Sequence, residues 1–293
     1  MNTFDRHFLQ VLVPHKNQPE KLIRLLESIP PEVDVIVVDD NSALHYFDAC
    51  QQAIDKRFKN VKLLRNDTGV NNAGVARNLA LAHANAQWII FADSDDKFYT
   101  ESFLKIMGFI KKTEADLIFF DVNAVKERDG TPSDRANVYS GLIDKWPLNK
   151  NTIAYHWVVP WGKVIRKAEL IDNHGLKFAS RIVGNDIEFA TDLAVVSSSI
   201  DVFKSVVYCC FESETSLTGS LTSEKARVRL HASSARNATL YKNRVPIFYN
   251  YNIQFFVKSL PVIVKEIDIR TMMLFLRNMY ISSVGNFRNM FRL

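Results

Sequence analysis

The stretch WIIFADSDD, residues 88–96, is a short apolar run that ends abruptly in acidic residues. Two other apolar runs also end in polar residues. FLQVLV (residues 8–13) is followed by PHK, and VDVIVV (residues 33–38) is followed by a pair of aspartates. Short runs this apolar are typical of strands that are covered on both faces. Ligand sites in α/β sheets lie at the carboxyl ends of the strands. The three polar ends therefore predict one site at one edge of a sheet.

Helical patterns separate these runs and the further strand-like segments. The predicted helices cover about residues 19–29, 44–58, 73–85 and 101–112, and the further strands cover residues 61–64 and 115–122. Strand–helix repeats of this spacing predict the α/β class, with a mostly parallel, Rossmann-like sheet and helices on both faces. Residues 128–150 are irregular and are interpreted as a crossover loop. After residue 220 the pattern is helical, which predicts a catalytic domain over 1–220 and a helical C-terminal extension over 221–293.

Cysteine usage and hydropathy point to a cytoplasmic location. The three cysteines, Cys50, Cys209 and Cys210, are odd in number and have no CxxC spacing, which argues against a disulfide framework or a zinc site. The apolar run near the N-terminus is too short and too interrupted for a secretory signal. No uninterrupted apolar run of about eighteen residues occurs, so we expect no transmembrane helix.

The acidic run at residues 93–96 has the residue types of a divalent-cation site. Mg²⁺ and Mn²⁺ prefer hard oxygen ligands, and Mg²⁺ commonly takes one or two carboxylates together with substrate phosphates. So small a set of protein ligands implies that a diphosphate completes the coordination. The alternative is a loop whose aspartates cap the following helix, and the motif alone does not separate the two.

Two further segments point to a nucleotide. An aspartate at residues 39–40 can accept a hydrogen bond from a ribose hydroxyl or a base N–H. The segment GVNNAGVARN, residues 69–78, has neither the GxxxxGK[ST] spacing of a P-loop nor GxGxxG after the first strand, which argues against P-loop proteins and Rossmann dehydrogenases. Its small residues permit a close backbone approach, and Arg77 either faces a diphosphate or lies on a solvated helix face.

These segments occur together in an order and spacing that resembles the family 2 glycosyltransferases. The segments that carry the resemblance are VLVPHKN, VIVVDDNS, GVNNAGVARNLALAHANAQWIIFADSDD, PWGKVIRKAEL and GNDIEFATDL, within about residues 8 to 220. The resemblance implies the GT-A fold and an inverting transfer from a nucleotide diphosphate sugar, usually a UDP-sugar. It also implies a Mn²⁺ or Mg²⁺ cofactor and a glycan or lipid-linked acceptor, as in surface polysaccharide synthesis. Residues 221–293 match no motif of this kind.

The resemblance assigns donor-binding roles to five residues. Pro14 and its neighbours would line the nucleotide pocket, with Asp40 holding the base. Arg77 would lie near the diphosphate and Asp93 near the ribose, and Asp95 would bind the metal ion.

The acceptor side is assigned to PWGK and GNDIEF. Trp161 would shape the acceptor site, with core packing as the alternative. Asp186 would be the general base, although Asn185 stands where the family usually has Glu. That asparagine removes a like-charged neighbour, which by itself lowers the pKa of Asp186. Glu188 is the fallback base, but two residues along a helix it would point away from Asp186.

Two other classes of function share parts of this pattern. A Mg²⁺-dependent phosphatase of the haloacid dehalogenase type also places DxD after an apolar strand, but it needs Thr or Val where this chain has Lys97, and its nucleophile strand usually comes first. A non-catalytic module that binds sugar nucleotides or glycans is supported only by Asn185. Turnover of a UDP-sugar would separate such a module from an enzyme.

The net charge of +5 is unevenly distributed. Residues 220–293 hold twelve Lys or Arg and three acids, a balance of +9, which leaves 5 − 9 = −4 for the rest. Mixed apolar and basic segments in this tail suit a helix on an anionic membrane surface, at the cytosolic face. The alternative is packing on the catalytic domain with the charges in water. Nucleic acid is not an expected partner, because no nucleic-acid motif accompanies the charge, and self-association is left open.

Overall fold

The apolar runs of the sequence become the strands of one twisted sheet. The computed structural model describes residues 7–147, 152–213 and 223–245, together with Ile269, Met273, Leu276, Arg277 and Tyr280. Within these residues eight strands form the sheet, in the order β3-β2-β1-β4-β7-β6-β8-β5. The strands are β1 (Leu9–His15), β2 (Asp34–Asp39), β3 (Val61–Arg65), β4 (Trp88–Phe91), β5 (Lys97–Phe98), β6 (Leu117–Lys126), β7 (Lys163–Arg166) and β8 (Ile200–Glu212).

The N-terminal half is a parallel sheet of four strands. β1 pairs in parallel with β2 and β4, and β2 pairs in parallel with β3. Every residue of β1 and β4 is buried, as these short, mostly apolar runs predict. His15, the last residue of β1, is in register with Asp39, the last of β2. The polar residues that follow these strands therefore lie at one edge of the sheet.

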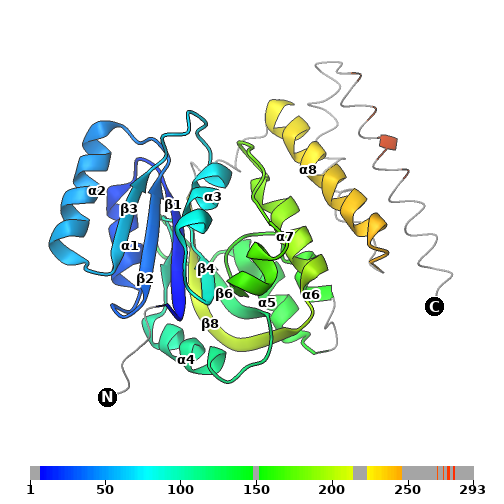
Figure 1. The fold of residues 1–293 in the computed structure, drawn as a ribbon, viewed down its shortest axis with the longest axis horizontal. Helices are drawn as coiled ribbons and strands as arrows, with labels where there is room; N and C mark the ends of the chain where they lie inside the picture. Colours follow the sequence, from blue (N-terminus) through cyan, green and yellow to red (C-terminus); the bar gives the residue numbers. More distant parts are fainter. Residues whose placement is uncertain are drawn as a thin grey trace.

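Three helices cover this half of the sheet. They are α1 (Pro19–Glu27), α2 (Leu44–Arg57) and α3 (Ala73–His83). Figure 1 shows α3 in front of β1 and α1 behind the sheet, so helices cover both faces as expected. Asn72 caps α3, since its Oδ1 accepts a 3.0 Å hydrogen bond from the Val75 N–H.

The other half of the sheet is mixed. β7 is antiparallel to both β4 and β6, whereas the long strand β8 runs parallel to β6 and antiparallel to β5. The β6–β8 register shifts on either side of Asp121. Such bulges bend a strand and increase its twist. Parallel pairs remain the more numerous within the described residues, in agreement with the predicted class.

The remaining helices lie between and after these strands. They are α4 (Thr100–Ile110), η1 (Asp134–Ala136, 3₁₀), α5 (Asn137–Asp144), α6 (Thr152–His156), η2 (Lys167–Asp172, π), α7 (Asn185–Val196) and α8 (Ser223–Lys242). The segment 128–150, expected to be irregular, thus contains η1 and α5. It carries few apolar positions, but Ala136 and Ile143 are buried and hold it against the sheet. The Ser133 Oγ starts η1 by accepting a 3.2 Å hydrogen bond from the Arg135 N–H.

The first described element after residue 220 is α8, which lies beside α7 (Figure 1). Leu240 and Val245 pack against Tyr155 and Val195. Most of the basic tail after residue 245 lies outside the described residues, and so does the prediction that it binds a membrane. Among the helices that are described, none combines the length and the apolar character needed to span a bilayer.

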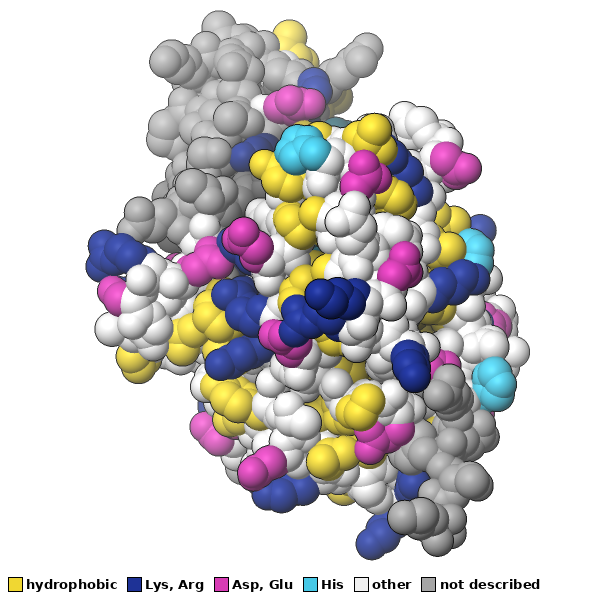
Figure 2. All heavy atoms as spheres, turned by 90° about the vertical axis from the view of Figure 1, so that its left-hand side faces the viewer, with side chains coloured by type: hydrophobic (Ala, Val, Ile, Leu, Met, Phe, Trp, Pro, Cys, Tyr) yellow, Lys and Arg dark blue, Asp and Glu magenta, His cyan; other side chains and the backbone are white. Residues whose placement is uncertain are grey.

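The face of the molecule on which α2 lies carries charges of both signs. Figure 2 shows Lys and Arg side chains interspersed with Asp and Glu across this face. Charges of mixed sign cancel at a distance, so this face does not present a large field of one sign.

Candidate active site

The ends of β1 and β2 are held together by a buried histidine–carboxylate pair. His15 Nδ1 lies 3.2 Å from Asp39 Oδ2, and its Nε2 accepts a 3.2 Å hydrogen bond from the Gln18 N–H. Ser42 donates to Asp39 from both its N–H and its hydroxyl. Burial acts to raise the pKa of Asp39, but the hydrogen bonds from His15 and Ser42 lower it overall. Asp39 is therefore a structural carboxylate.

Asp40 is the carboxylate at this strand end that meets the loop after β3. Its N–H donates a 2.7 Å hydrogen bond to the carbonyl of His15, next to the buried Pro14. Its Oδ1 accepts a 2.8 Å hydrogen bond from Asn66 Nδ2, and its Oδ2 lies 3.7 Å from Lys16 Nζ. The structure thus places the predicted residues Pro14 and Asp40 together, between the ends of β1 and β3.

Arg77 joins three elements at the centre of the site. From α3, its Nη2 donates a 2.7 Å hydrogen bond to Asp93 Oδ1 after β4, and its Nη1 donates a 2.9 Å hydrogen bond to Asn185 Oδ1 on α7. Its guanidinium lies 5.4 Å from the ring centroid of Phe178, and the residue is only 6% exposed. The alternative of a solvated helix face is therefore wrong. Contact with a diphosphate stays a prediction, because both terminal nitrogens donate to protein groups.

Gly74 permits the close approach that the small residues of 69–78 suggested. A Cβ at this position would lie 2.3 Å from the carbonyl oxygen of Ala179 and 3.0 Å from the Cβ of Asn185. The first turn of α3 is thereby packed directly on the backbone that leads into α7. Nearby, Asn78 clamps the same backbone by exchanging hydrogen bonds of 2.9 and 2.8 Å with the carbonyl and N–H of Phe178.

We expect Gly74→Ala to destabilise the protein by about 1–3 kcal/mol, because backbone must move to admit the methyl group. Urea denaturation measures the change in the free energy of unfolding. Gly108→Ala is the matched control: it lies within α4, its Cβ would meet nothing within 4 Å, and it should stabilise the protein by about 0.5–1 kcal/mol. Equal stability of Gly74→Ala and the parent chain would contradict the packing described.

The three aspartates that follow β4 have different roles. Asp96 is 1% exposed, and its two oxygens accept hydrogen bonds of 2.7 Å from the Tyr208 hydroxyl and 2.8 Å from the Phe211 N–H, both on β8. Burial, followed by the charges of Asp95 and Asp93, holds the pKa of Asp96 well above its usual range. Asp96 therefore fixes the loop to β8. Of the three aspartates in this run, Asp93 and Asp95 are the ones that remain as candidates for binding a ligand.

Asp95 has the electrostatic character expected of a cation ligand. Burial raises its pKa, and the neighbouring Asp93 raises it further. A divalent cation would relieve this repulsion, so these two carboxylates fit the predicted Mn²⁺ or Mg²⁺. In the part of the chain that the structure describes, no group of three or more His, Cys, Asp or Glu side chains is placed to hold a metal ion.

Asp186 lies in the first turn of α7, directly after the Asn185 that Arg77 binds. Burial raises its pKa above the ordinary value, and Asp93 adds to the shift, whereas Arg77 and Lys163 act to lower it. A carboxylate with a raised pKa is a better proton acceptor than an ordinary surface aspartate. Glu188, the fallback base, instead forms an ion pair with Arg181.

Trp161 lies in a cluster of aromatic rings and is 3% exposed. Its ring is stacked 5.9 Å from that of Tyr208 and meets Tyr139 edge-on at 5.0 Å. The Tyr208 hydroxyl accepts a 2.9 Å hydrogen bond from the Asp93 N–H and donates to Asp96. Trp161 therefore packs behind the acidic loop, and its contact with an acceptor stays a prediction.

Sequence reasoning missed two basic residues of this region. Arg135, in the segment interpreted as a loop, donates a 3.1 Å hydrogen bond to the Phe211 carbonyl. Burial acts against its charge, but Asp96 and the other acidic groups nearby raise its pKa overall. Lys163, in PWGK, is almost fully buried, and its ammonium group donates a 2.7 Å hydrogen bond to the Val159 carbonyl. Arg135 stands in no motif, and although Lys163 is part of PWGK, its burial was not expected, because a Lys in sequence is most often solvated.

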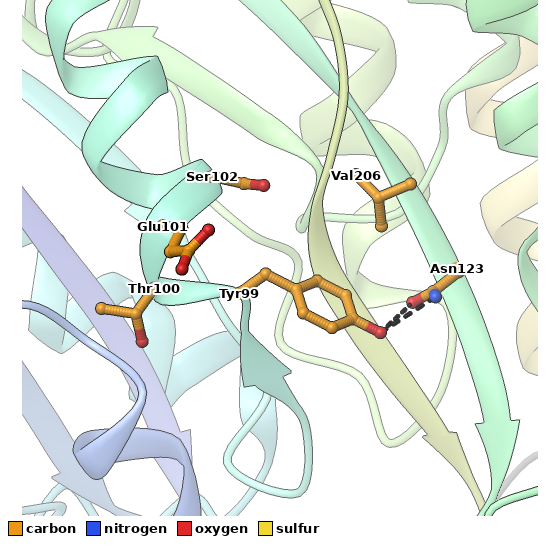
Figure 3. A pocket seen from close by; sticks show the side chains of 6 residues that line it. All are labelled: Tyr99, Thr100, Glu101, Ser102, Asn123 and Val206. Carbon is orange, nitrogen blue, oxygen red and sulfur yellow. Dashed lines mark hydrogen bonds between the residues drawn. The ribbon is translucent and has the colours of Figure 1, made fainter.

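A separate cavity of about 380 Å³ lies where α4 begins. Its lining residues are Tyr99, Thr100, Glu101, Ser102, Asn123 and Val206 (Figure 3). The Tyr99 hydroxyl and the Asn123 amide hydrogen-bond to each other, at 3.0 and 3.3 Å. None of the predicted site residues lines this cavity, so the acidic strand ends remain the candidate site.

Comparison with known proteins bears on the family and the fold. Residues 10–164 match the model of Glycosyl transferase family 2. Poly(ribitol-phosphate) beta-N-acetylglucosaminyltransferase TarS of Staphylococcus aureus strain Mu50 is 32% identical over 171 residues, which are 56% of this chain and 28% of TarS. TarP of S. aureus strain N315, which has the same enzyme name, is 23% identical over 294 residues, 83% of this chain and 87% of TarP. The match to TarS thus spans less than a third of that protein.

Solved structures show the same fold. The crystal structure of S. aureus TarS 1-349 superposes with a TM-score of 0.70 at 18% identity, over 95% of this chain and 80% of that one. A mannosyltransferase from Pyrobaculum calidifontis in complex with GDP-Man and Mn²⁺ superposes with a TM-score of 0.56 at 15% identity, over 95% and 81% of the two chains. The predicted fold and family are thereby confirmed, and the phosphatase alternative is wrong. This chain belongs to glycosyl transferase family 2 and has the GT-A fold.

Proposed function

We propose that this chain is an inverting glycosyltransferase that moves a sugar from a UDP-sugar to a hydroxyl of a glycan or lipid-linked acceptor, as in surface polysaccharide synthesis. The observation that carries the proposal is the Arg77 guanidinium, which ties Asp93, at the end of β4, to Asn185, next to Asp186. One side chain thereby joins the predicted donor-binding loop to the predicted base.

The donor side is supported by the arrangement around Asp40. The Asp40 carboxylate, whose Oδ1 accepts a 2.8 Å hydrogen bond from Asn66, would bind the nucleobase. Pro14 would line the nucleotide pocket, and Asp93 would lie beside the ribose. Among the structural relatives, TarS 1-349 has been solved in complex with UDP-GlcNAc and with UDP. We therefore take UDP-N-acetylglucosamine as the first donor to test.

The transfer itself needs one general base. Asp186 accepts the proton of the acceptor hydroxyl while the oxygen of that hydroxyl attacks the anomeric carbon. The bond from that carbon to the diphosphate oxygen breaks, and UDP leaves as an anion that needs no protonation. The sugar carbon passes through an oxocarbenium-like state. A Mn²⁺ or Mg²⁺ ion held by Asp95 would neutralise the charge that develops on the diphosphate.

We further propose that residues 1–220 form the catalytic domain and that residues 221–293 extend it. The described helix α8 packs on α7, which carries Asp186. The +9 balance of the tail suits an anionic membrane surface at which a lipid-linked acceptor would be available.

Nucleotide-sugar binding is tested by thermal denaturation in the presence of Mn²⁺. At about 100 times its Kd, a ligand of the folded state adds about 2.7 kcal/mol to the free energy of unfolding. In a chain of this size the midpoint should rise by about 5 °C. UDP-N-acetylglucosamine and UDP-glucose are compared with GDP-mannose, and a rise with GDP-mannose alone would contradict a UDP-sugar donor. Release of UDP during incubation separates an enzyme from a non-catalytic binding module.

A further inference from the structure

Tyr208 is a buried tyrosine in the interior of the sheet, and its hydroxyl group reaches the acidic loop, residues 93–96. It lies on β8, in register with Val122 of β6 and Phe98 of β5, and it is 0% exposed. The centroid of its ring lies 5.0 Å from that of Phe98, edge-on, and 5.9 Å from that of Trp161, stacked. Because protein interiors are close-packed, these contacts fix the ring and hence the position of the hydroxyl group.

The Tyr208 hydroxyl group joins the two ends of the acidic loop. It accepts a 2.9 Å hydrogen bond from the Asp93 N–H and donates a 2.7 Å hydrogen bond to Asp96 Oδ2. Burial, followed by the charge of Asp96, raises the pKa of Tyr208 well above its usual range, so the hydroxyl group keeps the proton that it donates. One side chain from β8 thereby closes the loop around Asp95.

The other contacts of the acidic loop each hold a single aspartate. Arg24, from α1, donates a hydrogen bond to the Asp95 carbonyl, and Arg77, from α3, donates a 2.7 Å hydrogen bond to Asp93 Oδ1. Without the Tyr208 hydroxyl group, the Asp93 N–H and Asp96 Oδ2 would both lose this partner. Buried polar groups are almost always hydrogen-bonded, so the loop would have to move to pair these two groups again.

We propose that Tyr208 is a positioning residue for the divalent cation and the donor diphosphate: by bridging Asp93 and Asp96, it fixes the backbone that carries the Asp95 carboxylate. This inference rests on the proposed function, in which Asp95 holds the metal ion. Mg²⁺ demands a near-ideal arrangement of its ligands. Groups that orient metal ligands from behind therefore change the affinity for the metal by about 10- to 100-fold when they are replaced.

Tyr208→Phe tests the proposal, because it removes the hydroxyl group and keeps the ring against Phe98 and Trp161. Calorimetric titration of UDP, with and without Mn²⁺, measures how much the metal ion increases the affinity. In the folded variant this increase should be about tenfold or more smaller than in the parent chain. The affinity for UDP without Mn²⁺ should stay near that of the parent chain. A residue with a purely structural role would lower the stability and leave the effect of Mn²⁺ unchanged.

Tyr99→Phe is the matched control. It also removes one tyrosine hydroxyl group, but the Tyr99 hydroxyl bonds to Asn123 in the separate cavity, so the effect of Mn²⁺ should equal that in the parent chain. If Tyr208→Phe responds to Mn²⁺ as strongly as the parent chain, the inference is overturned and the proposed function stands. If UDP binding by the parent chain does not respond to Mn²⁺, metal-assisted donor binding is refuted, and this inference with it.

A second measurement uses the parent chain and needs neither turnover nor a variant that folds. Hydrogen exchange of the Asp93 amide is followed by NMR in the ligand-free protein. Because this N–H donates to a buried hydroxyl group, its exchange should be about 10²-fold or more slower than in an unstructured chain. The protection should be present before Mn²⁺ or UDP is added. Exchange at the rate of an unstructured chain would show that Tyr208 does not hold the loop, which overturns the proposal.

Discussion

Asp186→Asn should lower turnover by about 10²-fold or more while the binding of a UDP-sugar stays near normal. Asparagine keeps the size of the side chain but cannot accept the proton of the acceptor hydroxyl. Because Arg77 donates to Asn185 and Asp93 rather than to Asp186, the donor-binding loop should keep its geometry. The measurement is kcat for transfer, together with the donor-induced rise in the thermal midpoint.

Glu188→Gln is the matched control for this change, two residues further along α7. Glu188 forms an ion pair with Arg181, so this variant should retain turnover within about threefold, since surface-type pairs contribute little. If Glu188→Gln abolishes turnover and Asp186→Asn does not, the two carboxylates exchange roles. The raised pKa of Asp186 also predicts that activity falls on acidification at a higher pH than an ordinary aspartate would give.

Asp95→Asn should abolish turnover and weaken Mn²⁺-dependent binding of UDP. Burial and the charge of Asp93 raise the pKa of Asp95, and a neutral amide removes both the repulsion and the hard anionic ligand that a divalent cation prefers. Titration of UDP by calorimetry, with and without Mn²⁺, measures the metal-dependent part of the affinity. Unchanged activity of this variant with Mn²⁺ present would refute the assignment.

Asp96→Asn separates a metal ligand from a structural neighbour. Asp96 accepts hydrogen bonds from Tyr208 and Phe211 on β8 and has no exposed face to offer a cation. Its replacement should lower the free energy of unfolding by about 1–3 kcal/mol, as for other buried hydrogen-bonded groups. UDP binding by the folded variant should still respond to Mn²⁺. If it does not, Asp96 takes part in holding the ion.

The position of the candidate site could be predicted from the sequence because it follows from the backbone alone. Apolar runs at residues 8–13, 33–38 and 88–91 are typical of buried strands, and strands that pair in parallel end at the same edge. The segment 128–150 was less predictable. Its helix α5 has one buried side chain, Ile143, with Tyr139 and Leu142 partly buried against the core, and it has no long apolar stripe that would show a helical period.

The residue types that gather at that edge can be read from the amino-acid sequence, since the apolar runs and the direction of the strands locate the polar residues that follow them. Which of those side chains can bind a ligand depends on the folded chain. Asp39 and Asp40 are adjacent in sequence, yet their partners differ. His15 and Ser42 hydrogen-bond to Asp39, whereas Asn66 hydrogen-bonds to Asp40. Likewise Asp96 is bound to β8, whereas Asp95 is repelled by Asp93. The physical reason is that hydrogen bonding, burial and charge act through space, between strands and helices whose separation along the chain carries no local signal.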